Sequence, residues 1–439
     1  MSKSEPTNPC FDFSETPSPV QLSEGRVRLV WRESEYLGTG KVLLRFLPTP
    51  RIVIDAAVSM PLDVSMPLAF GDLGDLALYL EGRQIEGFAT RRSGENDILH
   101  LIWNPNVEPL EWGELQTGEL AHVVSHLFNF PDFIGGCTPI TKLPNARRQL
   151  VLRSSGWRIA IQSLSGKATK EALDRVREEG GSQLTHVVRL ERDDGSLFTV
   201  EDVKSQILML TEFLSLVKGS SIWAVCEVGF DANGDRVWGS WCAPRIGEPP
   251  YSWSDKLRGD QVEALFPQFV RRWTQSEAWR DCLTHAIYWY TQANTGTGQP
   301  GIDSALILVL AALERLSHHR MVVDRKMILS EGFKALKASD KLRMLLSDLG
   351  IPIDIQNLTP EIQNKAKQYK WVDRPHAITE IRNTLVHPDS KVQASECFFE
   401  AWKLSLWYLE LSILALCGYQ GSYRNRLSQG NREDVPWKA

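Results

Sequence analysis

The segment Arg382-Asn383-Thr384-Leu385-Val386-His387 holds the residues of this chain that are best suited to chemistry. A histidine titrates near neutral pH and can act as a general acid or base. An arginine keeps its charge and offers paired donors to phosphate oxygens. RNA cleavage by the 2′-hydroxyl needs a proton acceptor, a proton donor and positive charge on the phosphorane. The segment therefore predicts a ribonuclease site that requires no metal ion.

The helix that must position these residues is predicted to end at His387. Pro388 cannot donate a helical N–H and disfavours α-conformation in the residue before it. Asn383 and His387 are four residues apart and share a face, whereas Arg382 and His387 are five apart, about 500° around a regular helix. We expect an unwound last turn and the long Arg382 side chain to bring the two groups together. The helix dipole would then favour protonated His387.

The pattern Arg382-Asn383-x-x-x-His387 matches the R-polar-x-x-x-H signature of the HEPN superfamily. The wider order resembles the ApeA-type HEPN domain of bacterial abortive-infection proteins: a Tyr-rich stretch at 286–290, then Ala312–Leu316, then Lys341–Leu346, then the motif. The resemblance is strong over residues 250–425 and loose before them. It implies a ribonuclease that cleaves cellular RNA, tRNA in particular, in response to a phage-derived trigger. It also implies a homodimer whose two motifs line one cleft.

The same resemblance assigns roles to four residues. Arg382 would bind and stabilise the phosphate, and His387 would act as general acid and base. Asn383 would orient the phosphate or its partner, and Glu314 would hold Arg382. Glu314 could equally form an ordinary helix pair with His318, four residues further on.

Basic residues near the motif are candidates for further RNA contacts along the backbone. Such runs are usually solvated faces, and a histidine pair at a helix end is usually solvated as well. The candidates are Lys365, Lys367, Lys370, Arg374, His318 and His319.

Three functions remain open, because a fold does not establish an activity. The first is a dimeric endoribonuclease whose N-terminal region senses or regulates. The second is a non-catalytic HEPN module that binds RNA or a protein, and the third is the toxin of a toxin–antitoxin pair. Asp389 stands where some HEPN toxins carry a tyrosine that a partner enzyme modifies, so control by that route is not expected.

The elements that must carry this site predict an α+β multidomain protein. We expect a loosely held tail over 1–24, a β-rich domain over 25–164 and an α/β extension over 165–249, with a linker at 246–250. An all-α HEPN helical bundle would follow over 250–425, and a tail over 426–439. Runs rich in Val, Ile, Leu and Trp predict strands at 26–31, 41–46, 51–56, 76–80, 98–103 and 148–153.

Capping and turn residues predict the remaining elements. Thr199 should N-cap a helix that reaches about Val217, and Asn233-Gly234 should form a hairpin turn. Asp303 should cap a central, nearly all-apolar helix, and Gly418 should end the last one. After Pro250, helices are expected at 261–274, 276–293, 303–319, 337–349, 361–370, 377–387 and 392–417.

Composition narrows the functional classes. The 439 residues carry a net charge of −5, but from Asp255 onward 24 Lys/Arg face 21 Asp/Glu, which permits RNA contact. We expect no cofactor, no membrane span and a cytoplasmic location. No metal is expected either, because the cysteines show no CxxC and no zinc spacing; they stand at 10, 137, 226, 242, 282, 397 and 417.

Two apparent motifs lack residues that their chemistry requires, and the role of the tryptophans stays open. Gly38-Thr39-Gly40-Lys41 lacks the Walker residues, and His122 and His126 lack the intervening glutamate of a zinc protease. Most of the fifteen tryptophans should be core. Some could instead line a recognition surface in the first domain, namely those at 31, 103, 112, 157, 223, 238 and 241.

Overall fold

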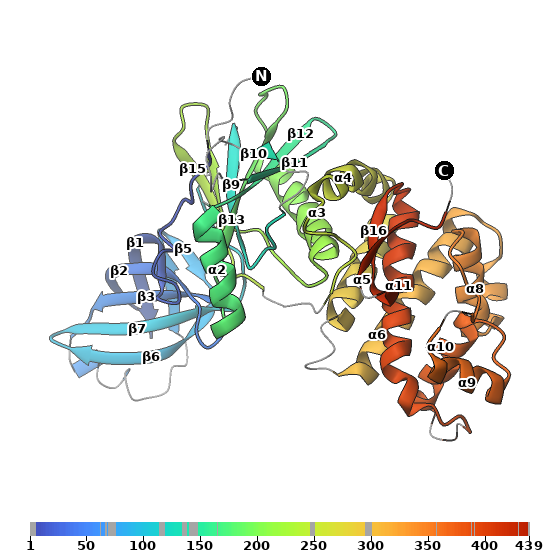
Figure 1. Ribbon diagram of the computed structural model, residues 1–439. Coiled ribbons are helices and arrows are strands. Elements are labelled where there is room, and N and C mark those ends of the chain that lie inside the picture. The colour runs from blue at the N-terminus through green and yellow to red at the C-terminus, as the bar shows by residue number, and fades with distance from the viewer. Residues whose placement is uncertain are drawn as a thin grey trace.

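The computed structural model is a mixed α+β protein with a β-rich N-terminal part and a helical C-terminal part (Figure 1). This agrees with the predicted α+β multidomain class. The linker predicted at 246–250 lies outside the described residues. The structure describes residues 6–61, 63–65, 68, 76–113, 119–133, 138–139, 148–164, 166–245, 251–294, 301–356, 358–387, 389, 391–428 and 430–437.

The first sheet has seven antiparallel strands in the order β5-β4-β1-β2-β3-β7-β6. Each run predicted between residues 26 and 103 falls on a strand of this sheet, but most of these strands extend beyond the predicted run by two to seven residues. The strands are β1 (Val20–Trp31), β2 (Ser34–Arg45), β3 (Arg51–Ser59), β4 (Leu76–Leu80), β5 (Arg83–Ile85), β6 (Gly87–Glu95) and β7 (Ile98–Pro105).

The second sheet has eight antiparallel strands in the order β10-β11-β12-β13-β9-β14-β15-β8. It joins strands from both sides of residue 164, so the structure does not divide there. The division falls between a sheet of residues 20–105 and a sheet of residues 110–241. The strands are β8 (Leu110–Gly113), β9 (His122–Phe128), β10 (Thr138–Pro139), β11 (Arg148–Ser154), β12 (Trp157–Ser163), β13 (Leu184–Arg192), β14 (Val225–Phe230) and β15 (Arg236–Trp241).

The second sheet lies between two hydrophobic cores. On β9, Val123 and Leu127 belong to a core shared with the helices, whereas Phe128 belongs to the core shared with the first sheet. This is the alternation that a strand covered on both faces requires. Two helices accompany this sheet, α2 (Gly166–Glu179) and α3 (Val200–Lys218).

Helix α3 begins as its sequence predicts. The Thr199 hydroxyl accepts from the Asp202 N–H at 3.2 Å, and the Asp202 carboxylate accepts from the Thr199 N–H at 3.1 Å, which forms a capping box. Gly219 ends the helix in the left-handed conformation at φ 81°. The Asn233-Gly234 turn joins β14 to β15 as expected, with Gly234 at φ 86°.

The predicted N-terminal tail is packed from residue 6 onward, which corrects that expectation. Phe13 is buried in the core under the first sheet, with its ring centroid 5.1 Å from that of His126. The Cys10 N–H donates to His126 Nε2 at 3.0 Å. His126 is itself buried on β9, and burial lowers its pKa to about 4. The segment was misjudged because its few apolar residues are held by partners far away in the sequence.

The C-terminal part is built of helices at the positions predicted, to within a few residues, except for the last two, whose starts move by three and six residues. Gly301, not Asp303, is the N-cap of α6, and Asp303 lies in its first turn. Neither the π-helix nor α7 was predicted from the sequence. The helices are α4 (Gly259–Thr274), α5 (Glu277–Asn294), α6 (Ile302–His318), the π-helix (His319–Asp324), α7 (Ser330–Ala335), α8 (Ala338–Asp348), α9 (Pro360–Tyr369), α10 (Arg374–Val386), the 3₁₀ turn (Ser395–Cys397) and α11 (Phe398–Cys417).

The predicted C-terminal tail forms a hairpin that closes onto the helices, which is a second correction (Figure 1). Strand β16 (Ser422–Asn425) and β17 (Asn431–Asp434) pair antiparallel across the 3₁₀ turn Arg426–Ser428. Arg426 is buried, and its guanidinium reaches Glu410 of α11 at 2.5 Å. The Tyr290 hydroxyl of α5 donates to the same carboxylate at 2.6 Å. A two-stranded hairpin therefore accompanies the helices, so this part is not all-α.

The second sheet and the helical part share one continuous core. Glu263 of α4 accepts the backbone N–H of Val151 on β11 at 2.7 Å. Asn294 of α5 donates to the Gly219 carbonyl at the end of α3 at 2.8 Å. Among the described residues, the helices are all too short or too polar to cross a membrane.

Candidate functional site

Helix α10 carries the Arg–His motif and ends where the sequence predicts. Asp373 caps its start by accepting the His376 N–H at 2.8 Å. Its last helical residue is Val386, and His387 follows in extended conformation at φ −123° and ψ 102°. Pro388 lies outside the described residues, but the extended backbone of His387 is the conformation that a following proline favours.

Arg382 is held at the junction of three helices. Its Nη2 lies 3.2 Å from Oε1 of Glu314 on α6, and Lys341 Nζ on α8 lies 3.3 Å from the other oxygen of the same carboxylate. Two cations thus share one anion, which leaves one formal positive charge. Of the two partners considered for Glu314, the structure shows Arg382, while the His318 ring packs against Phe333 instead. Lys341 was not singled out in the sequence, because only the fold brings α8 to this carboxylate.

The other two motif residues lie at the surface. His387 is exposed, and its backbone N–H donates to the Asn383 carbonyl at 2.9 Å. The Asn383 side-chain amide donates to Glu380 of the preceding turn at 3.4 Å. The imidazole is therefore accessible to a large substrate, while Asn383 is engaged within its own helix.

The two histidines after α6 have different surroundings. The pKa of the His318 imidazole is lowered by burial and by three cations, Lys334, Arg315 and Lys341. These cations mark a basic neighbourhood beside the Glu314 carboxylate, which suits an anionic ligand. His319, in contrast, is buried, so it is no longer a candidate for RNA binding.

His319 contacts Trp279 edge to face, with ring centroids 4.2 Å apart. Burial lowers the pKa of this imidazole. A ring that supports the packing of α5 cannot contact RNA at the surface, so the sequence-based assignment of His319 is wrong.

The basic run after α8 divides in the same way. Lys367 and Lys370 are exposed, whereas Lys365 pairs with Glu396 at 2.8 Å. Arg374 is buried and donates to the carbonyls of Asp354 and Gln356, which corrects its assignment as an RNA contact. The Arg374 guanidinium is the hydrogen-bond donor for these loop carbonyls. Residue type alone does not reveal this role.

No group of three or more His, Cys, Asp or Glu in the described part of the chain is arranged to hold a metal ion. The six described cysteines are free thiols, and Cys137 lies outside the described residues.

Two domain models and one full-length relative identify the family. Residues 116–252 match the YopA central domain, and residues 276–435 match the YopA C-terminal domain. The chain is 30% identical over 456 aligned positions to the SPbeta prophage-derived uncharacterized protein YopA of Bacillus subtilis (strain 168), covering 98% of this chain and 96% of that protein. The chain belongs to the YopA family. The YopA C-terminal domain contains the whole candidate site, and the YopA central domain contains almost all of the second sheet.

A second relative shares a shorter stretch. Over 190 residues the chain is 30% identical to the intermediate cleaving peptidase 55, mitochondrial, of Arabidopsis thaliana, which covers 41% of this chain and 36% of that protein. No solved structure matches this YopA-family chain.

Proposed function

We propose that the YopA C-terminal domain of this chain is a metal-independent endoribonuclease of the HEPN type, with α10 as its active element. The observation that carries the proposal is that Glu314 holds Arg382 beside Lys341, while an exposed His387 follows the last residue of the same helix. Fixed cations and an accessible imidazole are the parts that 2′-hydroxyl attack on RNA requires.

In the proposed reaction His387 takes the proton of the 2′-hydroxyl. The 2′-oxygen then forms a bond to phosphorus, and the bond from phosphorus to the 5′-oxygen breaks. The excess positive charge of the Arg382–Glu314–Lys341 cluster stabilises the phosphorane oxygens. The departing 5′-oxygen receives its proton from the imidazolium of a second copy of the chain, which is why we propose a homodimer with two motifs in one cleft.

We propose cellular RNA, and tRNA in particular, as the substrate, and abortive infection as the biological role. The relative in Bacillus subtilis is named as prophage-derived, a setting that fits a phage-related trigger. The N-terminal region would sense or regulate. Support for this comes from the shared core and from the hydrogen bond between Val151 and Glu263, through which movement in the second sheet would reach α4.

The alternative is a non-catalytic module that binds RNA or protein, and it has an observation in its favour. Asn383 is engaged by Glu380 and Arg382 by Glu314, which also suits a purely structural role for the motif. A toxin restrained by a separate antitoxin would need the same exposed His387.

The test is incubation of the purified protein with tRNA in EDTA. Wild-type protein should cleave, and both His387→Ala and Arg382→Ala should abolish cleavage. His285→Ala is the matched control, because His285 is a half-exposed histidine of α5 whose partner is Asp281, and its loss should leave cleavage unchanged. Intact tRNA with wild-type protein, with phage lysate supplied as trigger, would favour the binding module.

A further inference from the structure

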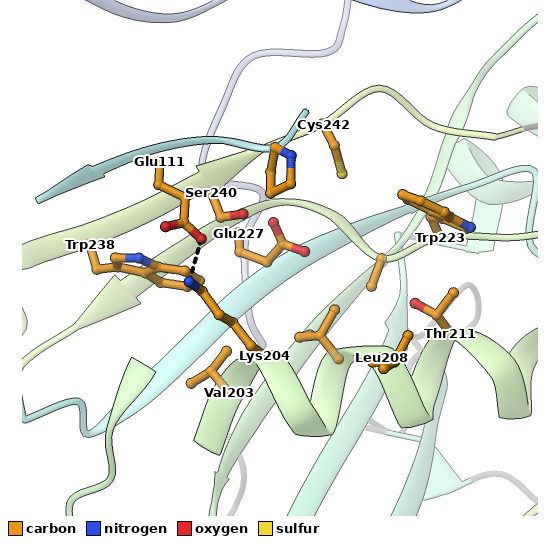
Figure 2. A pocket seen from close by; sticks show the side chains of 13 residues that line it. Glu111, Val203, Lys204, Leu208, Thr211, Trp223, Glu227, Trp238, Ser240 and Cys242 are labelled. Atoms are coloured by element: carbon orange, nitrogen blue, oxygen red, sulfur yellow. Dashed lines mark ion pairs between the residues drawn. The ribbon is translucent and has the colours of Figure 1, made fainter. Parts of the chain in front are cut away.

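A cavity of about 370 Å³ opens between α3 and the edge of the second sheet, far in sequence from the α10 motif (Figure 2). Its lining is mainly apolar, with Ile207 and Leu208 of α3 on one side. Figure 2 shows Glu227 between Trp238 and Trp223. The volume falls within the range of small-molecule sites, about 300–1,000 Å³.

A row of polar residues crosses the three strands that form the opposite wall. Glu227 on β14 is the register partner of Ser240 on β15, and Ser240 is the partner of Glu111 on β8. Side chains in register on neighbouring strands point to the same face, here toward α3. Glu111 pairs with Lys204 of α3 at 2.8 Å, so its charge is already compensated (Figure 2).

Glu227 differs from Glu111 because, among the described residues, its carboxyl has the Ser240 hydroxyl as a partner but no cation. Its side chain is 4% exposed, and its Oε2 has no hydrogen-bond donor. Trp238, which also lines the cavity, has a buried Nε1–H without an acceptor. A buried polar atom without a partner costs free energy that a bound ligand can recover.

We propose that this cavity binds a neutral or cationic aromatic nitrogen heterocycle of the nucleobase type, whose N–H group donates to Glu227. Indole rings at two positions of an apolar cavity favour a flat aromatic ligand, since aromatic faces and edges attract each other. The ammonium of Lys204 is already paired with Glu111, so this ion pair leaves no free cation for a ligand with several phosphates. The proposal does not depend on the ribonuclease activity of α10, because no residue of α10 lines the cavity.

The ligand class is tested by isothermal titration calorimetry on the full chain. The probes are guanosine, adenosine and cytidine, with N6,N6-dimethyladenosine as the matched ligand that lacks the adenine N–H donors. We expect saturable binding of at least one of the three nucleosides. If adenosine is that ligand, the dimethylated form should bind at least about tenfold more weakly, the loss expected when a buried acceptor is left without its donor.

Two variants place the binding in this cavity. Glu227→Gln should weaken binding at least about tenfold, and Leu208→Trp, which narrows the opening beside α3, should abolish it. Glu201→Gln is the control, because Glu201 is an exposed carboxylate of α3 that does not line the cavity. Thermal melting without ligand separates loss of binding from loss of folding.

The proposal is overturned by either of two outcomes. One is the absence of binding by all three nucleosides at millimolar concentration to folded wild-type protein. The other is equal affinity in wild type and in both cavity variants. Loss of tRNA cleavage in an α10 variant would leave nucleoside binding unchanged, so failure of one proposal is distinguishable from failure of the other.

Discussion

Replacing Glu227 with glutamine should remove a large part of the pH dependence of this protein's stability. Burial is the main cause that raises the pKa of the Glu227 carboxyl to about 8, and Glu111 also raises it. The hydrogen bond from the Ser240 hydroxyl lowers this pKa by a smaller amount. The unfolded chain should titrate near the ordinary value of 4.5. Between these two values the folded state holds a proton that the unfolded state has lost. Folding therefore takes up a proton, and stability falls as the pH rises through this window.

The magnitude follows from the size of the window. One proton corresponds to about 1.4 kcal/mol for each pH unit, so between pH 5.5 and 7.5 wild type should lose about 3 kcal/mol relative to Glu227→Gln. For a chain of 439 residues that unfolds as one unit the shift is roughly 1 °C per kcal/mol, so the difference in Tm should change by about 3 °C.

The assay is differential scanning calorimetry of both proteins at pH 5.5 and 7.5. Comparing the change between the two proteins cancels every other titrating group that they share. Glu171→Gln serves as the control, since Glu171 is an exposed carboxylate of α2. If the two Tm values kept a constant difference across this pH range, the reasoning about a buried, uncompensated Glu227 would be refuted.

Three further substitutions test other parts of the structure. Arg426→Met should destabilise the protein by about 3–5 kcal/mol, because it leaves the buried Glu410 carboxylate without its cation; chemical denaturation should also show partial recovery when Glu410→Gln is added. Thr199→Ala should cost about 1 kcal/mol by removing the capping box of α3, and an unchanged denaturation midpoint would contradict this. Glu314→Gln should change stability by about 1 kcal/mol or less, because the pair is partly exposed. The same substitution should lower kcat for RNA cleavage at least about tenfold with little change in KM, since a displaced Arg382 is poorly aimed; equal kcat values would count against a positioning role.

Most helices and strands were predictable because the residues that define each one are neighbours in the sequence. Strands such as Ser34–Arg45 show period-two burial, and the end of α10 follows from the proline after His387. The pairing of strands was not predictable in the same way. The second sheet combines strands on both sides of the boundary expected at 164, because hydrogen bonding between distant strands leaves no trace in either strand alone.

Only some of the candidate site residues could be predicted from the sequence, because contacts between distant segments decide which side chains are exposed. Residue type suggested Arg374 and His319 as surface groups, but both are buried by contacts with distant segments. The reverse error occurred at Arg426, expected in a tail and found paired inside the protein. Seven tryptophans were candidates for a recognition surface in the first domain, and Trp223 and Trp238 were among them. Only the fold reveals that Trp223 and Trp238 line a cavity with Glu227 between them.

The central claim is that α10 cleaves RNA through the 2′-hydroxyl, and the chemistry of the product ends tests it most directly. Purified protein and tRNA are incubated in EDTA, and the ends are analysed by phosphatase and kinase treatment before sequencing. We expect 2′,3′-cyclic phosphate and 5′-hydroxyl ends with wild type, and no products with His387→Ala. Products with 3′-hydroxyl ends, or cleavage that persists in His387→Ala, would contradict the account.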